Sequence, residues 1–128
     1  MKDLDVSVMW AACEVLNGGE SSVSSDAWGF GVLIVECLVR EDPFAGLVDP
    51  RAIPIAVNAG QCALDHVSAE GAKRLGKMPA ELSDKLQKLA RHCWKRDPYD
   101  RPSFSKILKR INRIASVSLL YCDCSSLV

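Results

Sequence analysis

No stretch of this sequence is long and apolar enough to cross a membrane as a helix. The longest apolar run, Ala27 to Val39, has thirteen residues and contains Glu36, whereas a transmembrane helix needs about 20. The first residues, Met1 to Asp5, carry two aspartates and lack the apolar segment of a secretory signal. We therefore expect no membrane partner and a cytoplasmic location.

The six cysteines lack the C-x-x-C pairs with which zinc sites are built. Cys62 stands alone, and Cys122 and Cys124 are separated by a single residue. Without a secretory signal, a disulfide framework is not expected either. Cys37 and Cys93 lie among apolar residues, where free thiols behave as small hydrophobic side chains. The sequence predicts no metal ligand and a reducing environment.

Charge is unevenly distributed although the formal net charge is zero. Residues 1–64 carry three Lys or Arg against nine Asp or Glu, and residues 65–128 carry thirteen against seven. A basic half can indicate nucleic-acid binding or the solvated face of helices. Because the basic residues alternate with apolar ones at helical spacing, we favour the helix face and expect no nucleic-acid partner.

Helical patterns dominate, and a clear alternating strand pattern is absent. Serines at 21–25 and Asp26 offer oxygens that can satisfy the free N–H groups of a helix start. The segment from Trp28 to Val39 is apolar on nearly every side, which indicates a helix surrounded by protein. We expect it to end near residues 40–42, because Pro43 cannot continue a helix.

The second half predicts further helices. Asp49 and Pro50 begin a short helix that ends at Gly60, and residues 60–79 read as a loop. Apolar residues at spacings of three and four predict amphipathic helices over 80–94 and 104–114. The predicted fold is all-α, with one apolar central helix surrounded by three or four others. Residues 1–114 form one domain and residues 115–128 a tail, which either extends the last helix or frays.

Four segments together resemble one family. Residues 10–16 read W-A-A-C-E-V-L, residues 25–32 read S-D-A-W-G-F-G-V, residues 42–46 read D-P-F-A-G, and residues 93–104 read C-W-K-R-D-P-Y-D-R-P-S-F. In this order they resemble protein kinases, especially the tyrosine-kinase and tyrosine-kinase-like groups. The resemblance covers about residues 9–114. It implies the helical C-terminal lobe of a kinase domain, from the end of the activation segment to the last helix.

The resemblance assigns structural roles to three charged residues and questions a fourth position. Glu14 and Arg101 match a buried salt bridge of the family; the alternative is that Glu14 is exposed near a frayed N-terminus. Asp26 matches an aspartate that braces the catalytic loop, but without that loop it would cap its own helix. Cys13 stands where the family has proline, which puts the local geometry in doubt.

Three further residues are assigned to the structure rather than to a ligand. Trp28 and Trp94 are expected in the core, and Gly31 belongs to the segment that contains Trp28.

The nucleotide chemistry of protein kinases is absent from the sequence. Phosphoryl transfer in this family uses a glycine-rich loop, a strand lysine and two aspartates. Gly29 and Gly31 begin such a pattern, but Ile34 stands where its third glycine belongs. V-A-I-K, H-R-D and D-F-G do not occur. We therefore assign no catalytic, cofactor-binding or metal-binding residue, and ATP and magnesium are implied only for a longer parent kinase.

Three functions remain open. In the first, the chain is part of a kinase that phosphorylates Ser, Thr or Tyr. In the second, it is a pseudokinase-like interaction module that docks a protein through residues 50–60. In the third, it is an unrelated helical adaptor. In the first two cases a protein partner, or the missing kinase lobe, would cover one flank of the central helix. We expect that flank to be exposed in the isolated chain and the chain to be marginally stable.

Overall fold

The computed structural model describes residues 6–126, and the side chains of residues 8–116. The acidic start at residues 1–5 and most side chains of the tail therefore lie outside the described part. The α-helices are α1 (Cys13–Leu16), α2 (Val23–Val39), α3 (Ile53–Asn58), α4 (Ala69–Gly76), α5 (Ala80–Cys93) and α6 (Phe104–Ser126). Short 3-10 turns are η1 (Val6–Trp10), η2 (Pro50–Ala52), η3 (Ala63–His66) and η4 (Pro98–Asp100). No strand occurs between residues 6 and 126, which confirms the all-α prediction.

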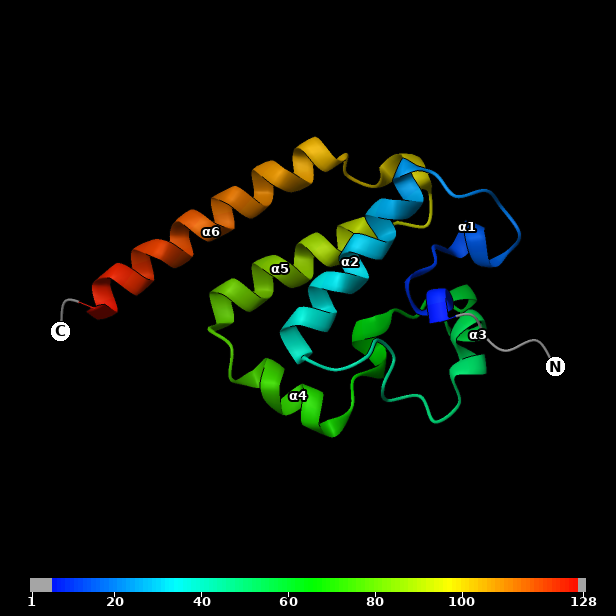
Figure 1. The fold of residues 1–128 in the computed structure, drawn as a ribbon, viewed down its shortest axis with the longest axis horizontal. Coiled ribbons are helices and arrows are strands. Elements are labelled where there is room, and N and C mark those ends of the chain that lie inside the picture. The colour runs from blue at the N-terminus through cyan, green and yellow to red at the C-terminus, as the bar shows by residue number, and fades with distance from the viewer. Residues whose placement is uncertain (1–5, 127–128) are drawn as a thin grey trace.

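Helix α2 runs through the middle of the molecule (Figure 1). It begins with a capping box in which the Ser22 hydroxyl accepts the Ser25 N–H at 3.1 Å and the Ser25 hydroxyl accepts the Ser22 N–H at 2.6 Å. It ends where Arg40 takes a left-handed conformation with φ 54°, three residues before Pro43. The predicted end of this helix is therefore confirmed.

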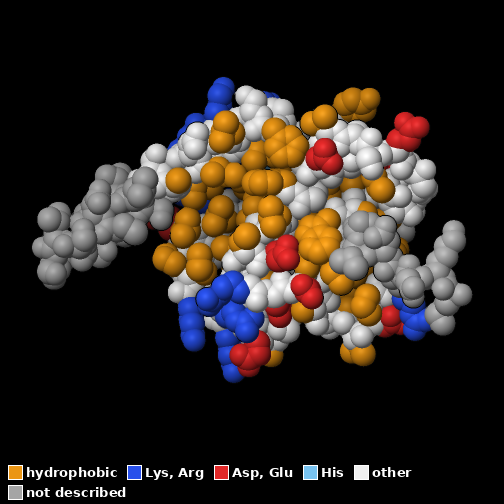
Figure 2. Space-filling view, viewed as in Figure 1, with side chains coloured by type: hydrophobic (Ala, Val, Ile, Leu, Met, Phe, Trp, Pro, Cys, Tyr) orange, Lys and Arg blue, Asp and Glu red, His pale blue; other side chains and the backbone are white. Residues whose placement is uncertain are grey.

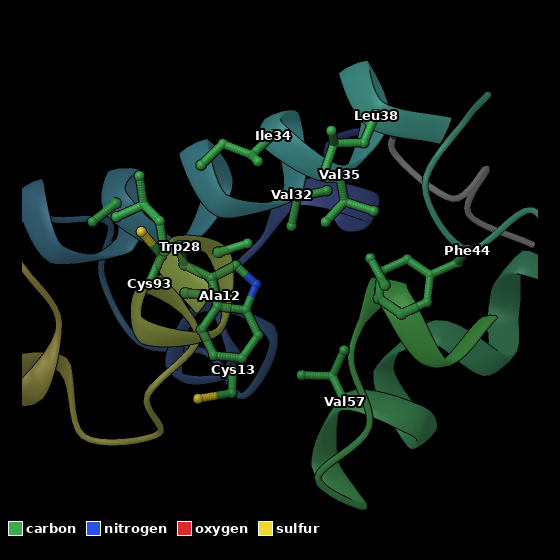
Figure 3. Close-up of a cluster of buried hydrophobic side chains, with 14 of the residues drawn as sticks. Ala12, Cys13, Trp28, Val32, Ile34, Val35, Leu38, Phe44, Val57 and Cys93 are labelled. Carbon is green, nitrogen blue, oxygen red and sulfur yellow. The ribbon is translucent and has the colours of Figure 1, made fainter. Parts of the chain in front are cut away.

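The hydrophobic core lies where α2 packs on α5, and side chains of α3 contribute to it (Figure 3). Val32, Leu89 and Cys93 have no exposed surface. Leu89 and Cys93 are one helical turn apart and therefore lie on the same, buried face of α5, which explains the apolar periodicity that predicted this helix. From the opposite side, Phe44 turns its ring into the core with φ 60°, a conformation that side chains seldom adopt and that tertiary packing must stabilise here.

Residues 60–79, predicted to be a loop, contain helix α4, so that prediction is wrong. The Ser68 hydroxyl caps this helix by accepting the Gly71 N–H at 3.1 Å. Glu41 in turn accepts hydrogen bonds from the Ser68 backbone N–H, at 3.0 Å, and from its hydroxyl. Arg74 reaches back to the Val39 carbonyl oxygen at 3.1 Å. These contacts with the end of α2 stabilise a helix whose two glycines disfavour it locally.

Helix α6 packs beside α5 and runs in the opposite direction (Figure 1). Ile107 is 2% exposed and fixes α6 to the core, with Ile111 packed partly against it. The helix continues through residues 115–126, so the backbone of most of the predicted tail extends the last helix. Within the described residues, no helix is both long and apolar enough to cross a membrane.

Candidate functional site

Arg101 ties together segments that are far apart in the chain. Its two terminal nitrogens donate to the two carboxylate oxygens of Glu14, each at 2.7 Å. Its Nε donates to the Lys95 carbonyl at 2.8 Å, and Nη1 also donates to the Ser24 carbonyl at 3.0 Å. The guanidinium carbon lies 5.0 Å from the centre of a Trp28 ring. One side chain thus joins α1, the start of α2 and the turn after α5.

Burial makes this ion pair different from a surface pair. The Arg101 side chain is 0% exposed and that of Glu14 is 26% exposed. Hydrogen bonding to Arg101 lowers the pKa of Glu14, against the opposing effect of its partial burial. The two parallel N–H···O bonds have the bidentate geometry that favours Arg over Lys. Glu14 is therefore not an exposed residue at a frayed end, which was the alternative considered from the sequence.

Cys13 occupies the first position of α1, beside this network. Its thiol lies 3.8 Å from Arg101 Nη2 and 3.7 Å from the Arg96 carbonyl oxygen. Burial, followed by the neighbouring Glu14, raises the pKa of the thiol. Ala12 before it is extended, with φ −65° and ψ 156°, which is the conformation that a residue preceding proline prefers. The backbone at this point is thus compatible with proline.

Gly31 and Trp94 meet where α2 crosses α5. A Cβ placed on Gly31 would lie 2.8 Å from Cys93 Cβ, 2.9 Å from Trp94 Nε1 and 3.1 Å from the Ala90 carbonyl oxygen. Only glycine permits this approach. The indole N–H of Trp94 is buried and has no hydrogen-bond partner among the described residues. The crossing of the two helices thus combines a close backbone approach with one unsatisfied buried donor.

Asp26 is separate from both groups and lies exposed on the first turns of α2. The expectation that it caps its own helix is wrong, because Ser22 is the N-cap and Ser25 completes the box. A hydroxyl at the N-cap position satisfies the N3 N–H group directly, whereas Asp26 is one position further into the helix. Its carboxylate remains close enough to the N-terminus to interact favourably with the helix dipole.

Arg96 is a structural residue that the sequence did not reveal. Its guanidinium donates to the Val57 carbonyl at 3.3 Å and to the Asn58 carbonyl at 2.9 Å. These are among the last carbonyls of α3, which have no partner within their helix. Arg96 therefore caps α3 from the turn that follows α5. The turn residues around it gave no signal for a contact 38 positions away.

One stripe of α2 is open to solvent. Val23 is 69% exposed and Leu33 44% exposed, and Phe30 is half-buried between them. Cys37 continues the stripe and is exposed, whereas Cys93 is buried, although both lie among apolar residues in the sequence. Figure 2 shows hydrophobic side chains gathered over the middle of this face. A helix that is apolar on nearly every side is thus covered along most of its surface, and this stripe is left open.

The stripe continues onto the start of α6. The rings of Phe30 and Phe104 meet edge to face with centroids 6.0 Å apart, and Leu108 one turn further is 59% exposed. The apolar face of α6 predicted from the sequence is therefore only partly buried. We refer to Val23, Phe30, Leu33, Phe104 and Leu108 as the open apolar face.

A second exposed apolar surface lies before and on α3. Val48 is fully exposed and Ile55 is 72% exposed, whereas Ile53 and Val57 of the same helix are buried. Arg51 is held beside this surface by an ion pair with Asp49 at 3.0 Å.

Clusters of side chains that could bind a metal or act in catalysis are scarce in the described part of the chain. Among these residues, no three His, Cys, Asp or Glu side chains gather where they could hold a metal ion. A cavity of about 160 Å³ lies between Trp28, Val57, Cys62 and Trp94, and Arg96 also lines it. Desolvation raises the pKa of the Cys62 thiol, which leaves it protonated at neutral pH. The lining therefore offers neither an activated nucleophile nor an acid–base pair.

Comparison with known proteins agrees with this architecture. Residues 1–111 match the model of a family described as protein tyrosine and serine/threonine kinase. The chain is 33% identical over 110 residues to mitogen-activated protein kinase kinase kinase 10 of Homo sapiens, covering 86% of this chain and 10% of that protein. It is 30% identical over 102 residues to the probable serine/threonine-protein kinase drkC of Dictyostelium discoideum, covering 80% of this chain and 12% of that protein. The chain thus spans about a tenth of the length of these relatives.

Proposed function

The chain belongs to the protein tyrosine and serine/threonine kinase family, and we propose that it is the helical lobe of a kinase domain, which transfers no phosphate by itself. The observation that carries this proposal is a combination. The Glu14–Arg101 pair, which the family places between its activation segment and its helical lobe, is formed, but the sequence holds none of the residues that position a nucleotide. The chain therefore has the structural framework of a kinase lobe without the residues that carry out phosphoryl transfer.

The division of labour in phosphoryl transfer explains this proposal. Catalysis depends on positioning ATP, magnesium and the acceptor hydroxyl, and on neutralising the charge of the transferred group. The glycine-rich loop, the strand lysine and the two aspartates perform those tasks. The residues of this chain supply the support beneath them: α2 as the central element and Arg101 as the anchor of the segment containing Glu14. Phosphorylation of Ser, Thr or Tyr would require a nucleotide-binding lobe joined to this one.

The first test is nucleotide binding and phosphoryl transfer by the purified chain. We expect no transfer of the γ-phosphate of Mg-ATP to a general acceptor protein. We also expect Mg-ATP to raise the melting temperature no more than magnesium triphosphate does, because a ligand stabilises only a fold that binds it. A larger saturable shift with Mg-ATP would reveal a site for the nucleoside and would contradict the proposal.

A protein-interaction role is a second candidate, and the surface at Val48 and Ile55 favours it. Two large apolar side chains are exposed there at 103% and 72%: Ile55 lies on the short helix that the family commonly uses for docking, and Val48 lies just before that helix. In this reading the lobe binds a protein through the surface at Val48 and α3 without catalysis. The test is affinity capture with the full chain and with a Val48→Asp, Ile55→Asp variant. A matched control is Tyr99→Asp, which changes another exposed residue, 95% accessible, on η4.

The capture experiment has two informative outcomes. Partners lost with the paired aspartates and kept with Tyr99→Asp would support docking through this surface. Partners unaffected by either change would exclude it.

A cytoplasmic setting is part of the same proposal. Cys13, Cys37, Cys62 and Cys93 are all free thiols, as expected where the environment is reducing.

A further inference from the structure

Helices α5 and α6 border an open hollow that is lined mainly by the side chains of basic residues, whose apolar stems form most of its surface. The cavity measures about 170 Å³ and is lined by Lys85 and Lys88 from α5, and by Arg110, Arg113 and Ile114 from α6. On each helix the two cations are three positions apart, so they project from the same face. The antiparallel packing of α5 and α6 brings these two faces together. We call this arrangement the basic groove.

Few carboxylates offset these charges. Glu81 contacts Lys85 at 3.2 Å, but the Glu81 side chain is 59% exposed and that of Lys85 42% exposed, so the pair is weak. Asp84 lines a different cavity, between α4 and α5. Helix α6 has no acidic residue from Phe104 to Ser116. Among residues 8–116, Lys88, Arg110 and Arg113 form no ion pair with a carboxylate.

One cation of the groove is held in place. Arg110 Nη1 lies 2.9 Å from Nδ1 of His92, one turn of α5 beyond Lys88. This contact orders the guanidinium without neutralising it, because a neutral imidazole carries no negative charge. Arg110 is also half-buried, which strengthens its field relative to a fully solvated side chain. The groove therefore has one oriented guanidinium, and three more basic residues line the same hollow.

We propose that the basic groove binds a polyphosphate anion, meaning a ligand with at least two neighbouring phosphate groups. Guanidinium groups match phosphate oxygens in a bidentate manner, and ammonium groups neutralise them as point charges. Four basic residues from two helices line the groove, which is more positive charge than one phosphate can neutralise. Such a ligand is either a free soluble anion or the phosphorylated headgroup of a lipid. This inference does not depend on the proposed kinase function.

The test uses the full chain and two probes. Inositol hexakisphosphate represents the soluble source, and phosphatidylcholine vesicles containing phosphatidylinositol bisphosphate represent the lipid source. Binding is measured by titration calorimetry for the first and by vesicle sedimentation for the second. The groove variant is Lys88→Gln with Arg113→Gln. The matched control is Lys106→Gln with Lys109→Gln, which removes the same charge from α6 outside the groove lining.

All four substituted side chains are exposed, so both variants should keep the fold, which circular dichroism will verify. We expect the groove variant to bind inositol hexakisphosphate roughly tenfold or more weakly, since two charge-assisted contacts are lost, and the control to bind nearly as the parent does. Binding to vesicles alone, lost in the same variant, would identify the lipid headgroup as the source. Equal weakening in both variants, or no binding of either probe, would overturn the proposal.

The two proposals fail separately. ATP carries a triphosphate, so any shift caused by the groove appears equally with magnesium triphosphate and disappears in the Lys88→Gln, Arg113→Gln variant. A nucleoside site would survive those substitutions.

Discussion

Arg101 and Glu14 are 87 positions apart in the sequence and share two hydrogen bonds of 2.7 Å. The Arg101 side chain is completely buried, and its other contacts include three backbone carbonyls and an aromatic ring. Among residues 8–116, Glu14 alone supplies the compensating charge. The arrangement predicts an asymmetric sensitivity, because loss of the carboxylate leaves a buried cation.

Glu14→Ala should therefore destabilise the chain strongly. We expect the free energy of unfolding to fall by about 3 kcal/mol, since a buried charge loses its partner. Glu81→Ala is the matched control, because it removes a carboxylate from an exposed pair and should cost less than about 1 kcal/mol. Urea denaturation followed by circular dichroism measures both. Similar losses for the two variants would show that the Glu14–Arg101 pair contributes no more than a surface pair.

The same pair predicts how stability depends on pH. The pKa of Glu14 is lowered in the folded chain from an ordinary value of 4.5, so the folded state favours the ionised carboxylate. Its contribution is complete above pH 4.5 and is lost as the pH falls through the lowered value. Melting temperatures of the parent and of Glu14→Gln should differ at neutral pH and converge in acid. The pKa values of Asp49 and Asp65 are also lowered, but the parent and the variant both contain these aspartates, so they do not contribute to the difference. A difference in melting temperature that stays constant with pH would refute the assignment to Glu14.

Gly31→Ala should separate α2 from α5. The new methyl group would lie 2.8 Å from Cys93 Cβ and 3.1 Å from the Ala90 carbonyl, and such overpacking costs about 1–3 kcal/mol. Gly76→Ala is the control, because nothing lies within 4 Å of a Cβ there and alanine favours the helix by roughly 0.5–1 kcal/mol. Thermal unfolding should thus shift in opposite directions for the two variants. A neutral Gly31→Ala would show that the crossing can relax.

Cys13→Pro should be tolerated although the residue is buried. Ala12 already has the extended conformation that precedes proline, and the first helical position needs no N–H donor. We expect the stability to change by less than about 1 kcal/mol, because proline also restricts the unfolded chain. Leu16→Pro removes the hydrogen bond from the Leu16 N–H to the Ala12 carbonyl at 3.0 Å and should cost about 3 kcal/mol or more. If the denaturation midpoints of the Cys13→Pro and Leu16→Pro variants fall equally, the backbone at Cys13 is not compatible with proline.

The open apolar face predicts dye binding by the isolated chain. Leu33→Gln should reduce the fluorescence of a bound hydrophobic dye with little loss of stability, because Leu33 is already 44% exposed. Val32→Ala, at a neighbouring position with 0% exposure, should keep the dye-binding face while costing about 2 kcal/mol. Fluorescence and thermal melting are measured on the same samples. Unchanged dye binding by Leu33→Gln would place the exposed apolar surface elsewhere.

Helices with a clear polar face could be predicted, and helix α2 shows why the remainder could not. In α5 the spacing of Leu89 and Cys93 predicts which face of the helix is buried, because polar residues occupy the other side. In α2 all sides are apolar, so the sequence cannot indicate that Cys37 is exposed; the neighbouring elements decide it. Helix α4 was missed because Gly71 and Gly76 lower local propensity, while the contacts from Glu41 to Ser68 that stabilise its start come from 27 positions away.

The candidate site divides in the same way. Glu14 and Arg101 could be paired only by family resemblance, since no local pattern joins residues so far apart. Exposure of Asp26 follows from which elements the chain places near α2, and that information is not local either. Arg96 as the cap of α3 depends on a turn lying against the end of another helix, a tertiary relationship with no periodic signature.

The distance along the chain between Glu14 and Arg101 has a consequence for the order of folding. Bringing together residues 87 positions apart closes most of the chain into one loop, and the entropy of closure opposes that step until other contacts have shortened it. The contacts of α5 with α6 span far fewer residues. We therefore expect the α5–α6 hairpin to form early and the ion pair to close last, so that it acts chiefly on the rate at which the folded lobe opens.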